Sequence, residues 1–324
     1  MTPDTMREII REAIASPSVH NVQPARWHID GESVLLLEDI SRRLAVGDPT
    51  GHDAAISLGA SAEGFALAAS KRGLRAQVER AGGEHAGYLI VARIMLDEGG
   101  APDPLADHLA TRASWRGPFH APSQADRKEA ALLGGQDRTI VSDPKVIGHI
   151  AELYDEASYG FMRREGFRSE LRHWMRLRKS HPRWARDGLN AAAMKLSGIE
   201  AWGAGLVLGP LFKPLAALGL TKALLAEKSS FAHAAGVVLF HHPRGEDPFE
   251  SGRAFHRLWL EIEAAGFGSN VLAAIADDEA IASHVGELAG LPSGDRLVSA
   301  FRIGRRDGEG FAPARLLLED VLVD

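Results

Sequence analysis

Apolar positions along the chain recur with helical spacing in some segments and form short β-prone runs in others, with polar turns between them. Thr2 can cap a first helix, Pro3 suits its first turn, and Ser16-Pro17 must end it. Asp30-Gly31 separates two β-prone runs and favours a hairpin. The elements expected up to residue 100 are a helix over 2–16, strands at 26–29 and 34–38, a long buried helix around 56–68 and a strand at 88–96.

The pattern breaks around residues 98–102, where Gly and Pro are concentrated, and a second cycle of elements follows. Its expected elements are helices at 123–133 and 144–178, an apolar helical stretch at 197–226, a strand at 236–240, a helix at 251–265 and a strand at 298–303. Helices and strands mix without strict βαβ alternation, which predicts an α+β fold. We expect a first half over 1–100 and a second half over 101–324, with a lid-like helical insertion at about 155–228.

Composition and charge narrow the function classes. The chain is 45% hydrophobic and 25% charged, which is ordinary for a globular protein, and its formal net charge of −6 argues against a general nucleic-acid binder. It has no cysteine, so any redox chemistry must come from a bound cofactor. The amino terminus lacks the apolar core of a signal peptide, and a cytoplasmic location is expected.

The most apolar stretch, 198–220, contains Glu200, Pro210, Lys213 and Pro214 and therefore offers no uninterrupted membrane span. We expect it to form a buried or lid-forming helical hairpin rather than a membrane contact.

Two polar segments are candidates for binding a ligand. In SPSVHNVQP, residues 16–24, the carboxamides of Asn21 and Gln23 each offer a donor and an acceptor, which suits the edge of a flavin ring, although the segment could also be a plain loop. In TRASWRGPF, residues 111–119, Arg112 and Arg116 flank Ser114, and guanidinium groups match phosphate or stabilise an anionic reduced flavin. A solvated surface turn is the other interpretation of that segment.

Two further segments carry weaker indications. Gly266-Phe267-Gly268-Ser269 lies between two expected helices. It is not a dinucleotide-binding fingerprint, because no strand precedes it and the third glycine is missing. Its glycines could let the backbone approach a flat ring, or could simply cap a helix. Arg315 precedes an apolar run near the carboxyl end and, taken alone, is typical of a surface arginine.

Together these segments resemble the nitroreductase superfamily, and most closely its Acg-type branch, in which two nitroreductase-like halves lie in one polypeptide. The resemblance implies central antiparallel-rich sheets flanked by helices, a pseudo-dimer of two halves, and one FMN per chain between them. It implies that Arg112, Ser114, Arg116 and Arg315 hold the phosphate, ribityl chain and pyrimidine edge. The other residues that the resemblance places in contact with the flavin are Ser18, Asn21, Gln23, Gly266, Gly268 and Ser269. Ala25 departs from the family, which commonly has Trp after Gln-Pro.

The resemblance implies an FMN-dependent oxidoreductase that passes reducing equivalents from NADPH or NADH to nitroaromatic, quinone-like or other conjugated small-molecule acceptors. No side chain need act as a strong acid or base, because the flavin carries the chemistry. One alternative is a flavin-storage protein with a lid-covered FMN, and another is oxidation of a specific metabolite. A monomer with an internal pseudo-dimer or a homodimer would both be compatible with fused halves.

Regularly spaced arginines and the histidines are the remaining candidates for a ligand site. Arg164, Arg168, Arg172 and Arg176 recur every four residues and predict either a solvated basic helix face or a lid that attracts phosphate, with Trp174, His181 and Trp184 beside the pocket. The 14 histidines show no metal-ligand spacing, so no metal is expected.

Overall fold

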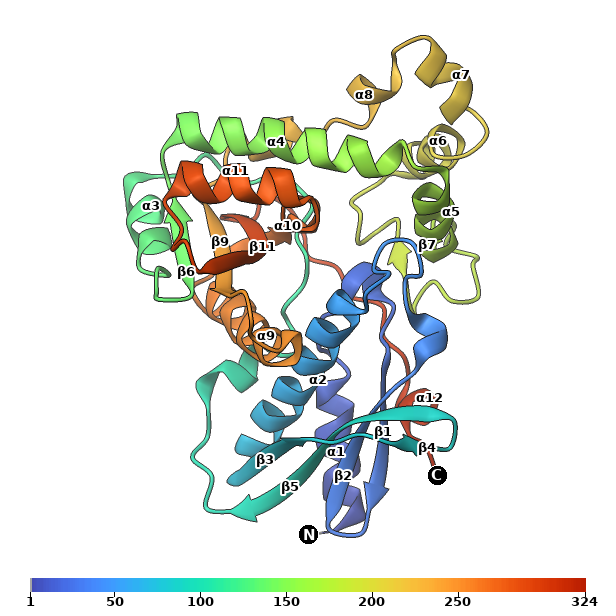
Figure 1. Ribbon diagram of the computed structural model, residues 1–324, viewed down its shortest axis with the longest axis vertical. Coiled ribbons are helices and arrows are strands. Elements are labelled where there is room, and N and C mark those ends of the chain that lie inside the picture. Colours follow the sequence, from blue (N-terminus) through green and yellow to red (C-terminus); the bar gives the residue numbers. More distant parts are fainter. Residues whose placement is uncertain (1) are drawn as a thin grey trace.

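The computed structural model describes residues 2–324 and contains two antiparallel sheets with helices packed against them (Figure 1). The first sheet has the strand order β1-β2-β5-β3, with β4 paired to β5, and the second has the order β10-β11-β9-β6. Their strands are β1 (Ala25–Asp30), β2 (Ser33–Glu38), β3 (Leu74–Arg80), β4 (Glu84–His85), β5 (Tyr88–Glu98), β6 (Arg138–Val141), β9 (Gly236–Pro243), β10 (Gly268–Val271) and β11 (Asp295–Gly304). The predicted α+β class with antiparallel-rich sheets is confirmed.

The helices are α1 (Pro3–Ala13), α2 (His52–Ser70), α3 (Gln124–Ala131), α4 (Pro144–Met162), α5 (Glu165–Trp174), α6 (Gly198–Val207), α7 (Phe212–Ala217), α8 (Thr221–Leu224), α9 (Pro248–Ala264), α10 (Ala273–Asp277), α11 (Glu279–Ala289) and α12 (Leu318–Val321). Short 3-10 turns lie at Val19–Asn21, Ile40–Arg42, Pro104–His108 and Lys228–Phe231. A small parallel pair joins β7 (Met175–Arg176) to β8 (Leu189–Asn190).

The first elements form as local sequence dictates. The hydroxyl of Thr2 accepts a hydrogen bond from the Thr5 amide at 3.3 Å, and Pro3 occupies the first turn of α1. Gly31 adopts a left-handed φ of 61°, which a tight hairpin turn requires, and β1 pairs with β2 in antiparallel register. The predicted first helix and hairpin are therefore confirmed.

Helices α2 and α9 pack closely against each other at the centre of the molecule (Figure 1). Their approach depends on glycine, because a Cβ added at Gly59 would lie 1.9 Å from the Phe249 carbonyl oxygen and one added at Gly252 would lie 2.2 Å from that of Ile56. Helix α2 also packs on the first sheet, while aromatic side chains of α9 contact Phe240 and Phe301 in the second. This helix pair therefore joins the two sheets.

The helical segments predicted over 144–178 are α4 and α5, but the prediction of one helix face through Arg164 to Arg176 is wrong. The chain turns after Met162, so that α4 and α5 are separate helices, with Arg164 as the N-cap of α5 and Arg176 in β7. The four regularly spaced arginines therefore do not share one helix face. Arg168 and Arg176 are buried, so the solvated basic face is wrong for these two.

The apolar stretch is also less buried than expected. Its helices α6, α7 and α8 lie at the outer edge of the molecule beyond the end of α4 (Figure 1), and many of their large apolar side chains are exposed. Pro210 lies in the turn between α6 and α7, and Gly219, with a left-handed φ of 71°, lies in the turn between α7 and α8.

Pattern reasoning also missed several elements, namely β3, β6, β10 and α11. Residues Gly268–Val271 form the strand β10, and the helix expected after the glycine segment is α10. The end of the chain returns to the first sheet, where the Val323 amide donates to the Trp27 carbonyl at 2.8 Å, and Leu316 and Val321 join the core that surrounds α1 and α2. The proposed boundary between halves near residue 100 remains a prediction.

Candidate functional site

The loop between α1 and β1 is held in an unusual backbone conformation. His20, Asn21 and Gln23 have positive φ values of 46°, 55° and 53°. The Ser18 hydroxyl accepts a hydrogen bond from the Gln23 amide at 2.9 Å, which closes the turn. Non-glycine residues in this region of φ are costly and concentrate at functional sites, because the surrounding structure must enforce them.

The carboxamides of this loop join three distant segments. Asn21 Nδ2 donates to the carbonyls of Gly188 and Ala314 at 3.2 and 3.0 Å. Gln23 Nε2 donates to the Arg186 carbonyl at 2.8 Å, and Gln23 Oε1 accepts from the Leu316 amide at 2.9 Å. The amides predicted to meet a ring thus hold the loop against the carboxyl-terminal segment. Their contact with a ring stays a prediction.

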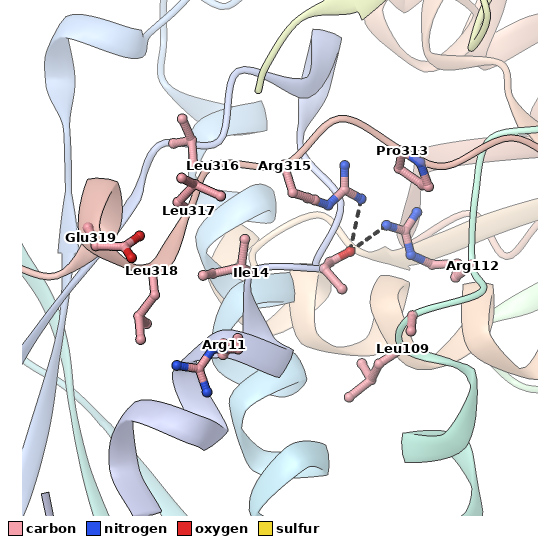
Figure 2. A pocket seen from close by; sticks show the side chains of 12 residues that line it. Arg11, Ile14, Leu109, Arg112, Pro313, Arg315, Leu316, Leu317, Leu318 and Glu319 are labelled. Atoms are coloured by element: carbon pink, nitrogen blue, oxygen red, sulfur yellow. Dashed lines mark hydrogen bonds between the residues drawn. The ribbon is translucent and has the colours of Figure 1, made fainter. Parts of the chain in front are cut away.

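Two guanidinium groups that lie far apart in the sequence, those of Arg112 and Arg315, converge beside this loop. Arg112 Nη2 and Arg315 Nη2 donate to the same carbonyl oxygen, that of Ala15, at 2.7 and 3.0 Å (Figure 2). Arg315 Nη1 also donates to Asn21 Oδ1 at 2.9 Å. Both Nε atoms are buried and have no hydrogen-bond partner among the described residues. The convergence brings three of the predicted site residues, Arg112, Asn21 and Arg315, into one cluster.

This pair lacks the carboxylate partner that the buried Arg42 and Arg176 have. Arg42 and Arg176 both bind the buried carboxylate of Asp187 at 2.6 and 2.8 Å. No carboxylate of residues 2–324 lies within ion-pair distance of Arg112 or Arg315. Burial, followed by the charge of Arg315, lowers the pKa of Arg112 well below its usual value, and burial lowers the pKa of Arg315 to about 10. Two uncompensated cations in one place favour an anion between or beside them.

A cavity of about 400 Å³ lies against this pair. Arg11, Leu109, Pro313 and Leu317 line it together with both guanidinium-bearing residues (Figure 2). Its lining is mostly apolar and carries three guanidinium groups against one carboxylate, that of Glu319, so cationic groups are in excess.

Ser114 and the glycine segment lie side by side. The Ser114 hydroxyl donates to Asn270 Oδ1 at 3.0 Å, and the Trp115 amide donates to the Ser269 carbonyl at 2.6 Å. Gly268 is required there, because a Cβ would approach Arg306 Cγ to 2.5 Å. The buried Ser269 hydroxyl has no partner in the described part of the chain. Gly266, with φ 74°, follows α9 as a left-handed cap.

Arg116 faces a different set of groups. Burial lowers its pKa, while the nearby Glu227 and Tyr154 act in the opposite direction. Burial, followed by the charge of Arg116, lowers the pKa of His20 to about 4, so that His20 is neutral at pH 7. Ser114 thus has Arg112 and Arg116 on either side of it, each in a different environment.

Sequence reasoning missed two residues near these clusters. Arg302 is 1% exposed in β11, donates to the Ser230 carbonyl at 2.8 Å, and has a pKa lowered by burial to about 10. His256 is buried in α9 near Arg112, and burial followed by that charge lowers its pKa to about 3. The available indication for Arg302 was a charged residue inside an otherwise apolar strand.

The described residues form neither a metal site nor a membrane-spanning helix. Within residues 2–324 no group of three or more His, Asp or Glu side chains is arranged to hold a metal ion. None of the described helices is both long enough and apolar enough to cross a bilayer.

Comparisons with known proteins give partial matches. No protein-family model matches the chain. A Mycobacterium tuberculosis protein named acg, described as an NAD(P)H nitroreductase, is 35% identical over 80 residues, which cover 25% of this chain and 24% of that protein. Another protein of the same organism, described in the same way, is 31% identical over 77 residues, which cover 24% of this chain and 22% of that protein. The matched region thus spans about a quarter of the length of these curated relatives.

Similar solved structures are more distant in sequence. A protein from Anabaena variabilis described as a nitroreductase has 10% identity and a TM-score of 0.43, and the match covers 94% of this chain and 88% of that chain. The FMN-dependent nitroreductase NfnB from Mycobacterium smegmatis, solved in complex with NADPH, has 16% identity and a TM-score of 0.34. That match covers 63% of this chain and 88% of the NfnB chain. At such TM-scores the likeness is partial. The sequence likeness to the two mycobacterial proteins is likewise confined to about a quarter of the chain.

Proposed function

We propose that this chain is an FMN-dependent oxidoreductase that passes reducing equivalents from NAD(P)H to nitroaromatic, quinone-like or other conjugated acceptors. The observation that carries the proposal is the pair Arg112 and Arg315, two buried guanidinium groups that share one carbonyl and have no carboxylate partner among the described residues. A phosphate monoester supplies the charge that this pair lacks, and guanidinium binds phosphate in a bidentate geometry.

The neighbouring groups fit the rest of the cofactor. Ser114 offers a hydroxyl to a polar chain, and the unpartnered hydroxyl of Ser269 offers another. Arg116 provides a positive charge that would stabilise an electron-rich ring, and the neutral His20 beside it adds no competing charge. When bound, FMN would supply two-electron chemistry at its ring, which side chains alone cannot provide. The protein's part would be to bind, orient and exclude water.

The first experiment is an absorbance spectrum of the purified protein, followed by anaerobic addition of NADPH and of NADH. We expect flavin absorbance that either nucleotide bleaches and that a nitroaromatic or quinone acceptor restores. Flavin absorbance that resists both nucleotides would instead favour storage of the flavin. A protein that cannot be loaded with FMN would contradict both hypotheses.

A substitution tests the assignment of the phosphate. Arg112→Ala should weaken FMN binding at least about tenfold, or about 1.4 kcal/mol, because one of two cations is removed from the anion site. The measurement is a fluorescence titration of FMN with apoprotein. Arg75→Ala is the matched control, since the Arg75 side chain is 68% exposed on β3, and its FMN affinity should equal that of the unsubstituted protein. Equal affinities in both variants would count against the site.

A further inference from the structure

A surface at the outer edge of the molecule combines exposed apolar side chains with an excess of positive charge. We name it the α5–α8 surface and define it by residues 163–228. Half of the large apolar side chains that are exposed in the described chain lie on it, namely Ile199, Trp202, Leu211, Leu218, Leu220 and Leu224. Ile199, Trp202 and Leu218 are 83%, 64% and 71% exposed. A globular protein rarely leaves such side chains together in water without a partner.

The same surface is basic within an acidic protein. Residues 163–228 contain thirteen Lys and Arg against five Asp and Glu, although the whole chain has a formal net charge of −6. Between residues 188 and 226 Glu200 is the one acidic residue. The exposed members of the basic set include Arg163, Arg172, Lys179 and Lys222. The surface therefore attracts anionic partners despite the net charge of the chain.

Helix α5 is joined to α7 and to the turn before it. The buried Arg168 guanidinium stacks on the Phe212 ring at 3.7 Å from its centroid. Lys213 Nζ forms an ion pair with Glu165 at 3.1 Å, and the Arg172 guanidinium lies against Gly209. These contacts place the basic side chains of α5 on the same part of the molecule as the exposed apolar segment that follows. Figure 1 shows α7 and α8 projecting beyond the end of α4, away from both sheets.

We propose that the α5–α8 surface binds the surface of an anionic lipid membrane, with Trp202, Leu218 and their apolar neighbours inserted among the lipids and the flanking Lys and Arg side chains on the headgroups. Apolar insertion and headgroup attraction together are the two components of peripheral membrane binding. Trp suits the interface between hydrocarbon and water. The charge selects this occupant over a second copy, because a two-fold contact would place the same basic side chains against each other.

Cosedimentation with vesicles tests the proposal on the full chain. We expect binding to vesicles of phosphatidylglycerol mixed equally with phosphatidylcholine, little binding to pure phosphatidylcholine, and a loss of binding as salt concentration rises. Trp202→Ser should reduce the partition coefficient about tenfold, because the largest inserted side chain is lost. Lys222→Glu should reduce it about fivefold or more.

Matched control variants test whether vesicle binding depends on this surface or on any exposed apolar or basic side chain. Leu132→Ser removes a side chain that is also 83% exposed, but at the end of α3, and Lys128→Glu reverses an exposed charge on α3. Both should leave the partition coefficient unchanged. All four positions are exposed, so circular dichroism and FMN absorbance should match those of the unsubstituted protein. This test is independent of the proposed oxidoreductase activity, because the vesicles require no flavin turnover.

Three results would overturn the proposal. One is equal vesicle binding by Trp202→Ser and the unsubstituted protein. Another is a concentration-dependent dimer that sedimentation velocity detects without lipid and that Trp202→Ser abolishes, since a second copy would then cover the surface. The third is shielding of Trp202 from a fluorescence quencher by FMN alone, which would show that the segment closes over the flavin site.

Discussion

At the scale of single residues, the central fact is how each buried arginine is compensated. Arg42 and Arg176 share the carboxylate of Asp187, which offsets part of the cost of burying their charges. Arg112 and Arg315 share only a neutral carbonyl. A protein that buries charge without a counter-charge is less stable than it could be, and a bound anion would remove that cost. The residue pattern thus points to a ligand.

His256 makes the unfolding free energy depend on pH. Its Nδ1 donates to the Ala60 carbonyl at 2.7 Å, and its pKa is lowered to about 3 from an ordinary value of 6.5, first by burial and then by Arg112. As pH falls below about 6.5, the unfolded chain binds a proton at this residue while the folded chain does not. The free energy of unfolding should therefore fall with decreasing pH, by up to about 1.4 kcal/mol per unit from this residue.

The measurement is urea denaturation at several values between pH 7 and pH 4, with and without His256→Gln. Gln can still donate to the Ala60 carbonyl and does not titrate, so the slope of stability against pH should become shallower by the contribution of one proton. His20, with its pKa lowered to about 4 by burial and then Arg116, contributes in the same direction and remains in both proteins. Parallel slopes in the two proteins would show that His256 takes up a proton in the folded state.

At the scale of elements, the contact between α2 and α9 decides how the two sheets are joined. Gly59→Ala should lower the free energy of unfolding by about 2 kcal/mol, because the new methyl group meets the Phe249 carbonyl and the helices must separate. Chemical denaturation measures this loss. Gly148→Ala in α4 is the matched control, since nothing lies within 4 Å of its added Cβ. The free energy of unfolding of that variant should rise by about 0.5 kcal/mol, because Ala has a higher helix propensity than Gly. An unchanged free energy of unfolding for Gly59→Ala would mean that α2 and α9 can accommodate the added methyl group without losing their contact.

At the scale of the whole molecule, the carboxyl-terminal segment ties distant parts of the chain together. Its Arg315 amide donates to the Ala185 carbonyl at 3.1 Å, and Leu316 and Val321 pack into the core around α1 and α2. Val321 is only 3% exposed although it is residue 321 of 324. Val321→Ala should therefore lower the free energy of unfolding by about 2 kcal/mol. Leu317→Ala, at a side chain that is 50% exposed, should change the free energy of unfolding by less than about 0.5 kcal/mol.

Thermal unfolding checks this pair of variants. A lowered melting temperature for Val321→Ala alone is expected. Equal melting temperatures would show that the terminal segment frays from the core before the rest unfolds, in which case it could not hold Arg315 beside Arg112 in the proposed anion site.

The sequence alone determined those features that depend on neighbours along the chain. Thr2 with Pro3, the Asp30-Gly31 turn and the apolar strands at β5, β9 and β11 could be predicted because capping, turn conformation and β-propensity are local properties. The resemblance of short motifs to the nitroreductase superfamily also singled out Arg112 and Arg315, which the structure brings to one carbonyl. It did not indicate Arg302 or His256, whose significance depends on burial within distant packing partners.

Only the tertiary structure decided which charges would lie together and which would be compensated. The regular spacing of Arg164, Arg168, Arg172 and Arg176 suggested one helix face, but the chain turns after Met162, and Arg176 pairs with Asp187. Residues 15, 112 and 315 meet although nearly the whole chain separates the first from the last. Spacing along a sequence can predict a shared face only within one element, whereas burial and compensation of charge depend on how elements pack.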